Sequence, residues 1–166
     1  MKKPILKVDM DGVTADFYSA VMALAPEGKT LHPTQNSDWV YDVCKANPRI
    51  FRTLEPIPGA IPTINRLKEH YEVYFLSTPM SVVPESFTDK FLWLEEHFGE
   101  WVHERLILTH RKDLSIAHYL IDDRKVNGVE NFTGVHIHFG TEDFPDWETV
   151  EFYLMKKITH KNIQPC

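Results

Sequence analysis

The chain has 166 residues, of which 43% are hydrophobic and 25% are charged, enough for one domain with a proper core. Its formal net charge of −6 excludes a broad basic surface. Stable binding to nucleic acid, which depends on neutralising phosphates, is therefore disfavoured. A small anionic substrate remains compatible, because a metal or a few local cations can hold it.

The cysteines and the N-terminus favour a cytoplasmic protein. Cys44 and Cys166 are too few to staple a fold of this size and form no C-x-x-C motif, so we expect reduced thiols, with a surface disulfide as the alternative. An aspartate interrupts the first apolar run, which excludes a signal peptide. No apolar run approaches the ~20 residues of a membrane helix. A homodimer is left open.

Strands and helices alternate along most of the chain. Runs rich in β-branched and aromatic residues predict strands at 5–10, 71–78, 105–109, 119–123 and 134–140. Apolar residues at helical spacing predict helices within 59–71, 84–99 and 145–160. This alternation predicts an α/β fold with a Rossmann-like three-layer core and a parallel, doubly wound sheet.

Residues 15–57 do not fit a simple crossover between the first two strands. They hold two predicted helices, near 15–25 and 37–46, with a Pro/Gly/Asn-rich loop between them. A connection this long indicates an insertion. We expect one domain over 1–166, with a small helical cap inserted at about 15–57, above the strand ends.

Polar side chains gather at the predicted carboxyl ends of the strands, where open α/β sheets bind ligands. Clustered carboxylates repel one another unless a cation joins them, and oxygen ligands suit Mg²⁺. A hydroxyl and a lysine would complete a phosphate cradle, and an aspartate is a plausible nucleophile. The strand-end residues are Asp9, Asp11, Ser77, Thr78, Arg111, Lys112, Asp122 and Asp123.

The order of these motifs resembles that of the haloacid dehalogenase superfamily. More narrowly, "DMDGVTADF", "LEPIPGA", "FLSTPM", "DKFLWLEEHFG", "LILTHRK" and "LIDDR" resemble segments of the 5′(3′)-deoxyribonucleotidase family. The similarity touches most of residues 5–124. It implies a HAD-like fold and a Mg²⁺-dependent phosphatase that hydrolyses nucleoside monophosphates through an aspartyl-phosphate intermediate.

The resemblance also assigns the acidic residues. Asp9 would attack phosphorus, and Asp11 would protonate the leaving oxygen and then activate water. Asp9, the backbone carbonyl of Asp11 and Asp122 would hold Mg²⁺. Asp123 would support this metal site.

By the same resemblance, Ser77 and Thr78 would donate to the phosphoryl group. Lys90 would neutralise the phosphate and the nucleophile. On its helix, Lys90 also has an ordinary interpretation as a solvated lysine.

Four further residues would line the substrate pocket. Phe17 and Phe51 match family aromatics that shape the sugar and base pocket, although aromatics usually belong to a core. Arg111 and Lys112 lie where the family reads T-R-D-K; this chain reads T-H-R-K, with His110 in place of arginine. The base preference is therefore not fixed.

Three other functions stay open at this point. The same chemistry could serve another small phosphomonoester, such as a sugar phosphate. A receiver-like signalling module also gathers acidic residues, a hydroxyl and a lysine around Mg²⁺, without catalytic release of phosphate. A 3′-phosphatase acting on nucleic-acid ends is disfavoured by the negative net charge.

His136 and His138 alternate on a predicted strand and are expected to be structural.

Overall fold

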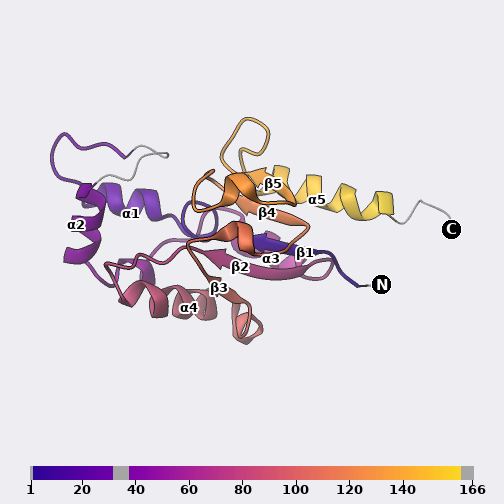
Figure 1. The fold of residues 1–166 in the computed structure, drawn as a ribbon, viewed down its shortest axis with the longest axis horizontal. Helices are drawn as coiled ribbons and strands as arrows, with labels where there is room; N and C mark the ends of the chain where they lie inside the picture. The colour runs from indigo at the N-terminus through magenta and orange to yellow at the C-terminus, as the bar shows by residue number, and fades with distance from the viewer. Residues whose placement is uncertain (1, 32–37, 162–166) are drawn as a thin grey trace.

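Five parallel strands form the sheet, with β1 at its centre (Figure 1). The computed structural model describes residues 2–31 and 38–161, without the side chains of 159–161. The spatial order is β3-β2-β1-β4-β5. The predicted fold class is confirmed, and the strands are slightly shorter than expected. They are β1 (Ile5–Val8), β2 (Glu72–Ser77), β3 (Leu106–Leu108), β4 (Tyr119–Asp122) and β5 (Val135–His138).

Three helices cover one face of the sheet and enclose the main core. They are α3 (Ala60–Leu67), α4 (Glu85–Phe98) and α5 (Trp147–Lys161). Gly99, with φ of 80°, adopts a conformation that ends α4, as expected for glycine after a helix. Asp146 caps α5 by accepting from the backbone nitrogen of Thr149 at 2.8 Å. These local signals fix where α4 ends and where α5 begins.

The other face of the sheet has a thinner cover. Leu76, Leu120 and Val129 are buried there, with Ile107 and Phe132 packed against them. The cover includes two short 3₁₀ segments, η3 (Lys112–Leu114) and η4 (Val129–Asn131). Segments of three residues have no apolar periodicity, so they could not be predicted from the sequence.

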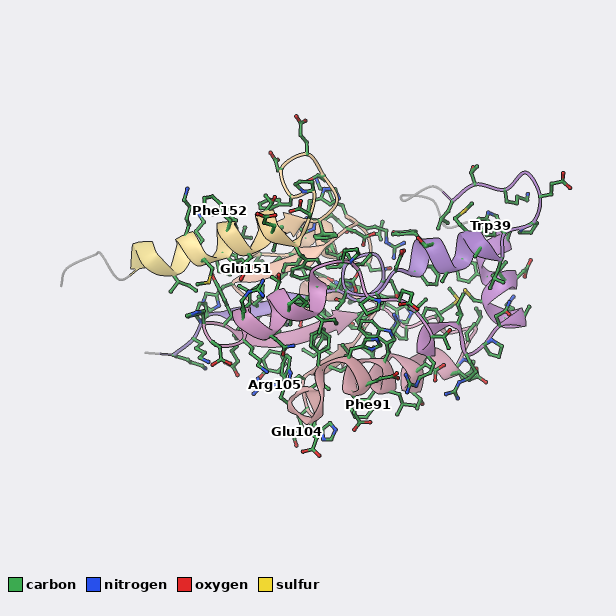
Figure 2. All side chains as sticks on the ribbon, turned by 180° about the vertical axis from the view of Figure 1, so that it is seen from behind. Trp39, Phe91, Glu104, Arg105, Glu151 and Phe152 are labelled. Carbon is green, nitrogen blue, oxygen red and sulfur yellow. The ribbon has the colours of Figure 1, made fainter. Side chains whose placement is uncertain are left out.

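The residues between β1 and α3 lie beyond the end of the sheet (Figure 1). They form α1 (Phe17–Ala23), α2 (Asp38–Ala46) and the 3₁₀ segment η1 (Ile50–Arg52). One more 3₁₀ segment, η2 (Glu100–Val102), lies elsewhere in the chain, directly after α4. Figure 2 shows Trp39 of α2 at the end of the molecule opposite to Phe152 of α5. Part of the expected loop, 32–37, lies outside the described residues.

The two ends of this segment meet. Ala15 pairs with Pro56 in an antiparallel bridge. The backbone nitrogen of Asp16 donates to Glu55 O at 2.8 Å, and that of Ile57 donates to Thr14 O at 2.9 Å. The chain therefore leaves the sheet after β1 and returns to it at nearly the same place.

Two sequence expectations concern the thiols and the membrane. Cys44 is a buried free thiol, whereas Cys166 lies outside the described residues. Burial, followed by the negative charge of Asp11, raises the pKa of Cys44 to about 11. Across 2–31 and 38–161, no helix is both long and apolar enough to cross a membrane.

Trp147 offers a test of how α5 is tied to the loop after β1. Its side chain is 1% exposed, and Nε1 donates to Val13 O at 2.9 Å. Trp147→Phe keeps an aromatic ring but leaves this buried carbonyl without its partner. We expect the free energy of unfolding in urea to fall by about 1–3 kcal/mol.

Phe152→Ala on the same helix is the control, because its side chain is 63% exposed. It should change the free energy of unfolding by less than about 0.5 kcal/mol. Equal losses for the two variants would contradict the assigned role of the indole hydrogen bond.

Candidate active site

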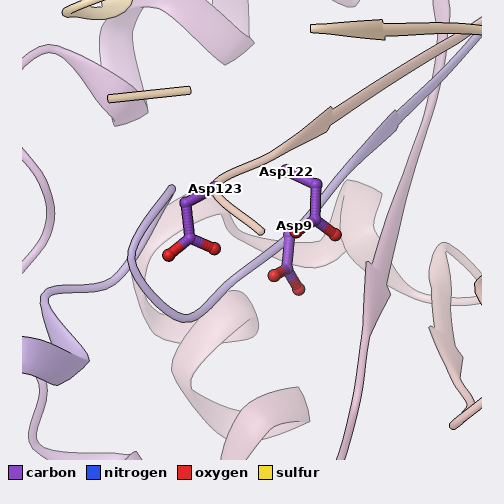
Figure 3. Close-up of side chains that lie close together, drawn as sticks. All are labelled: Asp9, Asp122 and Asp123. Carbon is purple, nitrogen blue, oxygen red and sulfur yellow. The ribbon is translucent and has the colours of Figure 1, made fainter. Parts of the chain in front are cut away.

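Three aspartates meet where β1 and β4 end (Figure 3). Asp9 follows β1, Asp122 ends β4, and Asp123 comes next. One carboxylate oxygen from each lies within 4.8 Å of the others. The backbone nitrogen of Asp9 donates to Ile121 O at 2.9 Å, which aligns the two strand ends. The predicted juxtaposition at the carboxyl edge of the sheet is thus present.

Lys112 lies between two of these aspartates. Its Nζ is 2.9 Å from Oδ1 of Asp9 and 2.5 Å from Oδ2 of Asp122. The lysine is 2% exposed. Burial alone would lower the pKa of Lys112, but the negative charges of Asp9 and Asp122 outweigh it and raise that pKa. The expected substrate-binding lysine therefore lies directly against the predicted nucleophile.

The other two aspartates are harder to ionise than ordinary ones. Burial, followed by the negative charge of Asp9, raises the pKa of Asp122 above its usual range. The same two causes raise the pKa of Asp123 to about 6. Tyr18 opposes this effect at Asp123 by donating its hydroxyl to Oδ2 at 2.5 Å.

A glycine turn allows the loop after β1 to approach β4. Gly12 has φ of 79°, which side chains other than glycine rarely adopt. A Cβ at this position would lie 2.5 Å from the Tyr18 ring and 2.6 Å from Oδ2 of Asp123. Thr14 also steadies the turn, donating Oγ1 to Asp9 O at 2.5 Å. Both the backbone conformation and the space therefore require glycine here.

Asp11 lies apart from the three clustered carboxylates and pairs with Lys90. Nζ of Lys90 is 2.7 Å from both carboxylate oxygens of Asp11. The lysine is 1% exposed, so it is not the solvated residue of the alternative interpretation. Its ammonium lies 4.9 Å from the centre of the Phe51 ring, which stacks on Phe17 at 5.4 Å. In this structure Lys90 contacts Asp11, and Lys112 contacts Asp9.

The remaining predicted residues differ in their placement. Ser77 ends β2, and its buried Oγ has no hydrogen-bond partner among the described residues. Thr78 donates Oγ1 to Thr109 O at 3.0 Å. Arg111 has a side chain that is 62% exposed and pairs with Asp113 at 2.6 Å, so the structure does not bring it to the aspartates.

Two histidines support the backbone of the aspartate pair. Nε2 of His136 lies 3.0 Å from Asp122 O, and Nε2 of His138 lies 2.9 Å from Asp123 O. Because carbonyl oxygens only accept, both rings donate from Nε2. The sequence signal for this role was the alternation of histidines on β5, which pairs with β4. Sequence reasoning also missed Tyr18, which nothing in its local pattern singled out.

The atoms of the site fit a hard divalent cation. Oδ1 of Asp9 and Oδ1 of Asp123 are buried and have no hydrogen bond of acceptable geometry within the described part of the chain, although Lys112 lies near the first. The donors are all oxygens, the ligand type that Mg²⁺ prefers. Lys112 contacts two of the three carboxylates, and the positive charge of Arg124 also acts on Asp123 and Asp9, so two cations face three carboxylates and the cluster still lacks positive charge.

Comparison with known proteins places this geometry in a family. The family model described as 5′ nucleotidase, deoxy (pyrimidine), cytosolic type C protein matches residues 3–147. A Vibrio phage KVP40 protein, provisionally named 5′(3′)-deoxyribonucleotidase, is 44% identical over 152 residues, covering 92% of this chain and 85% of its own. The chain belongs to this nucleotidase family. It is therefore a phosphoric monoester hydrolase of the 5′-nucleotidase type.

Other members of the nucleotidase family are more distant. A Staphylococcus epidermidis protein with the same provisional name is 33% identical over 153 residues, covering 84% of each chain. The human 5′(3′)-deoxyribonucleotidase, cytosolic type, is 29% identical over 167 residues, covering 87% of this chain and 77% of its own.

Solved structures of other hydrolases share the fold of this nucleotidase. A haloacid dehalogenase-like hydrolase from Xanthomonas campestris has a TM-score of 0.56 at 10% identity, covering 98% of this chain and 100% of its own. A HAD hydrolase from Bacillus subtilis, solved bound to magnesium, has a TM-score of 0.52 at 12% identity, covering 93% and 99%. These likenesses confirm the HAD-like fold.

The raised pKa of Asp123 predicts a pH-dependent stability for the metal-free nucleotidase. The folded-state pKa of about 6 exceeds the ordinary value of 3.8, so ionising this carboxyl weakens folding as the pH rises between them. Asp123→Asn removes that titration. In EDTA, its free energy of unfolding relative to wild type should rise by on the order of 2 kcal/mol from pH 4 to pH 7.5.

Urea unfolding at a series of pH values measures this difference. Asp143→Asn is the matched control, because it removes an exposed carboxylate that is not part of the aspartate cluster. The stability difference between Asp123→Asn and wild type could instead stay constant over this pH range. That result would show that ionising Asp123 does not destabilise the folded state.

Proposed function

We propose that this nucleotidase is a Mg²⁺-dependent phosphatase that hydrolyses deoxyribonucleoside monophosphates through an aspartyl-phosphate on Asp9. The observation that carries the proposal is the separation of the carboxylates into two groups. Asp9 shares a buried cluster with Asp122 and Asp123, whereas Asp11 is held apart by Lys90. A nucleophile and a separate proton-transfer group are the two parts that this mechanism needs.

In the first step a carboxylate oxygen of Asp9 forms a bond to phosphorus as the bond from phosphorus to the nucleoside oxygen breaks. Asp11 gives its proton to the departing oxygen. In the second step Asp11 takes a proton from water, the water oxygen attacks phosphorus, and the bond to Asp9 breaks. Inorganic phosphate, the carboxylate of Asp9 and the protonated carboxyl of Asp11 result.

The cations and the free hydroxyl suit the phosphoryl oxygens. Ser77 has an unpartnered Oγ that can donate, and Lys90 and Lys112 have ammonium groups beside Asp11 and Asp9. Donors that are fixed before the reaction stabilise charge as it develops in the transition state. Thr78, whose hydroxyl already donates to a backbone carbonyl, would offer its backbone at the same strand end.

Asp9, Asp122 and the backbone carbonyl of Asp11 would hold Mg²⁺, with Asp123 in support. When bound, the ion draws charge from the transferring phosphoryl group. The buried oxygens without hydrogen bonds support this assignment, as does the magnesium bound by the Bacillus subtilis hydrolase of the same fold.

Residues 15–57 would act as the cap of a single domain that spans the chain. Their two ends pair at Ala15 and Pro56, and Phe51 lies over Lys90. We propose that Phe17, which is only partly buried, faces the sugar and base of the nucleotide, whereas Phe51 is 2% exposed and stacks on Phe17 from within the core. Arg111 would act only from the rim of the site. The human relative is described as the cytosolic type, and we propose a cytoplasmic location for this enzyme also.

Asp9→Asn tests the nucleophile. The amide cannot form the aspartyl-phosphate, so kcat for dUMP and dTMP with Mg²⁺ should fall by at least about 10³-fold while the protein remains folded. Phosphate release measures the rate, and circular dichroism checks the fold. Asp143→Asn, which removes an exposed carboxylate, should keep wild-type activity. Near-wild-type turnover by Asp9→Asn would exclude this mechanism.

A panel of phosphate esters tests the substrate class. We expect deoxyribonucleoside monophosphates to have a kcat/KM at least about tenfold above those of sugar phosphates and phosphoglycolate, because the partly buried Phe17 offers a ring face for a base. EDTA should abolish release, and added Mg²⁺ should restore it. A preference for a non-nucleotide ester would reassign the substrate, and full activity in EDTA would remove the metal from the proposal.

A further inference from the structure

A buried ion pair joins α4 to the segment that carries Phe51. Asp89 of α4 has a fully buried side chain, and neither of its carboxylate oxygens has a hydrogen bond of acceptable geometry among the described residues. Nη2 of Arg49, the residue before η1, lies 2.8 Å from Oδ1, and the Arg49 side chain is 60% exposed. The charge of Arg52 also stabilises Asp89, but Arg49 is its ion-pair partner within 4 Å among the described residues, and a buried carboxylate is costly to leave without such a partner.

Two more contacts join the same segment to the same stripe of α4. Nε1 of Trp93 donates to Leu54 O at 2.7 Å, and Arg52 pairs with Glu96. Asp89, Trp93 and Glu96 are spaced four and three residues apart, so they lie on one side of the helix. Residues 49–54 are therefore fastened along α4 by three side chains.

This fastening sets the surroundings of Lys90. The lysine follows Asp89 in α4, as Phe51 follows closely after Arg49 on the facing segment. The Phe51 ring lies 4.9 Å from Nζ of Lys90, and Nζ reaches both oxygens of Asp11 at 2.7 Å. Lys90 is 1% exposed beneath this ring, so its ammonium is held beside Asp11.

We propose that Asp89 is a positioning residue: its ion pair with Arg49 holds Phe51 over Lys90 and so fixes the direction of the Asp11 carboxylate. This inference rests on the proposed function, because it gives Asp11 the task of protonating the leaving oxygen. Of the three contacts, the Arg49–Asp89 pair has the buried charge, so its loss frees the segment most.

The inference predicts a leaving-group signature that a general loss of structure lacks. The alkoxide released from dUMP needs a proton, whereas the nitrophenolate released from p-nitrophenyl phosphate is stable without one. Because kcat/KM reports only the steps up to release of the leaving group, Asp89→Asn should lower kcat/KM for dUMP by about tenfold and that for p-nitrophenyl phosphate by less than about twofold. A smaller fraction of folded enzyme would lower both values equally.

Arg49 supplies a second route to the same test. Arg49→Gln removes the partner charge from an exposed side chain and should show the same selective loss for dUMP. The double variant Arg49→Gln/Asp89→Asn should be no slower than either single variant, because both remove one interaction. Glu96→Gln, which weakens the exposed pair with Arg52 on the same helix stripe, is the matched control and should keep both rates within about twofold.

Each outcome decides the matter. Equal losses of kcat/KM for the two substrates, additive losses in the double variant, or unchanged kcat/KM for dUMP in Asp89→Asn and Arg49→Gln would overturn the positioning role. If Asp89→Asn does not fold, the rates of Arg49→Gln decide alone. Failure of the wild-type enzyme to hydrolyse dUMP with Mg²⁺ would instead overturn the proposed function, and the inference with it.

Discussion

The mutual repulsion of three carboxylates is the constraint on which the rest of the site depends. Asp9 and Asp122 are forced together because β1 and β4 are parallel neighbours whose carboxyl ends lie at one edge. The fold answers with Lys112 between the two and with the Tyr18 hydroxyl at Asp123. The remaining deficit of positive charge makes the cluster receptive to a cation. The same repulsion therefore destabilises the metal-free fold and favours the binding of a cation.

The sequence was informative about the sheet and about the gathering of the acids. Runs of β-branched residues located all five strands, and the rule for parallel sheets predicts that Asp9, Ser77 and Asp122 lie at one edge. The partners of the two lysines could not be foreseen. Lys112 belongs to a three-residue 3₁₀ segment without periodicity, and the direction of Lys90 depends on contacts with distant residues of η1.

His136 and His138 were predicted to be structural, but their hydrogen-bond partners could not be predicted, for a related reason. His136 and His138 act on backbone carbonyls of the neighbouring strand, and the choice of neighbour is a property of the strand order. Arg111 was expected at the substrate because of its position after β3, but Asp113, two residues later, binds it on the surface. Local sequence identified candidates; tertiary pairing decided which of them face the aspartates.

The closure of the segment between β1 and α3 onto itself at Ala15 and Pro56 has an evolutionary consequence. Because the chain leaves and re-enters the sheet at nearly one place, a longer or shorter connection between α1 and α2 adds little entropy cost to folding. Evolution can therefore vary that outer part of the segment while Tyr18 and residues 49–54, which contact Asp123 and α4, are kept.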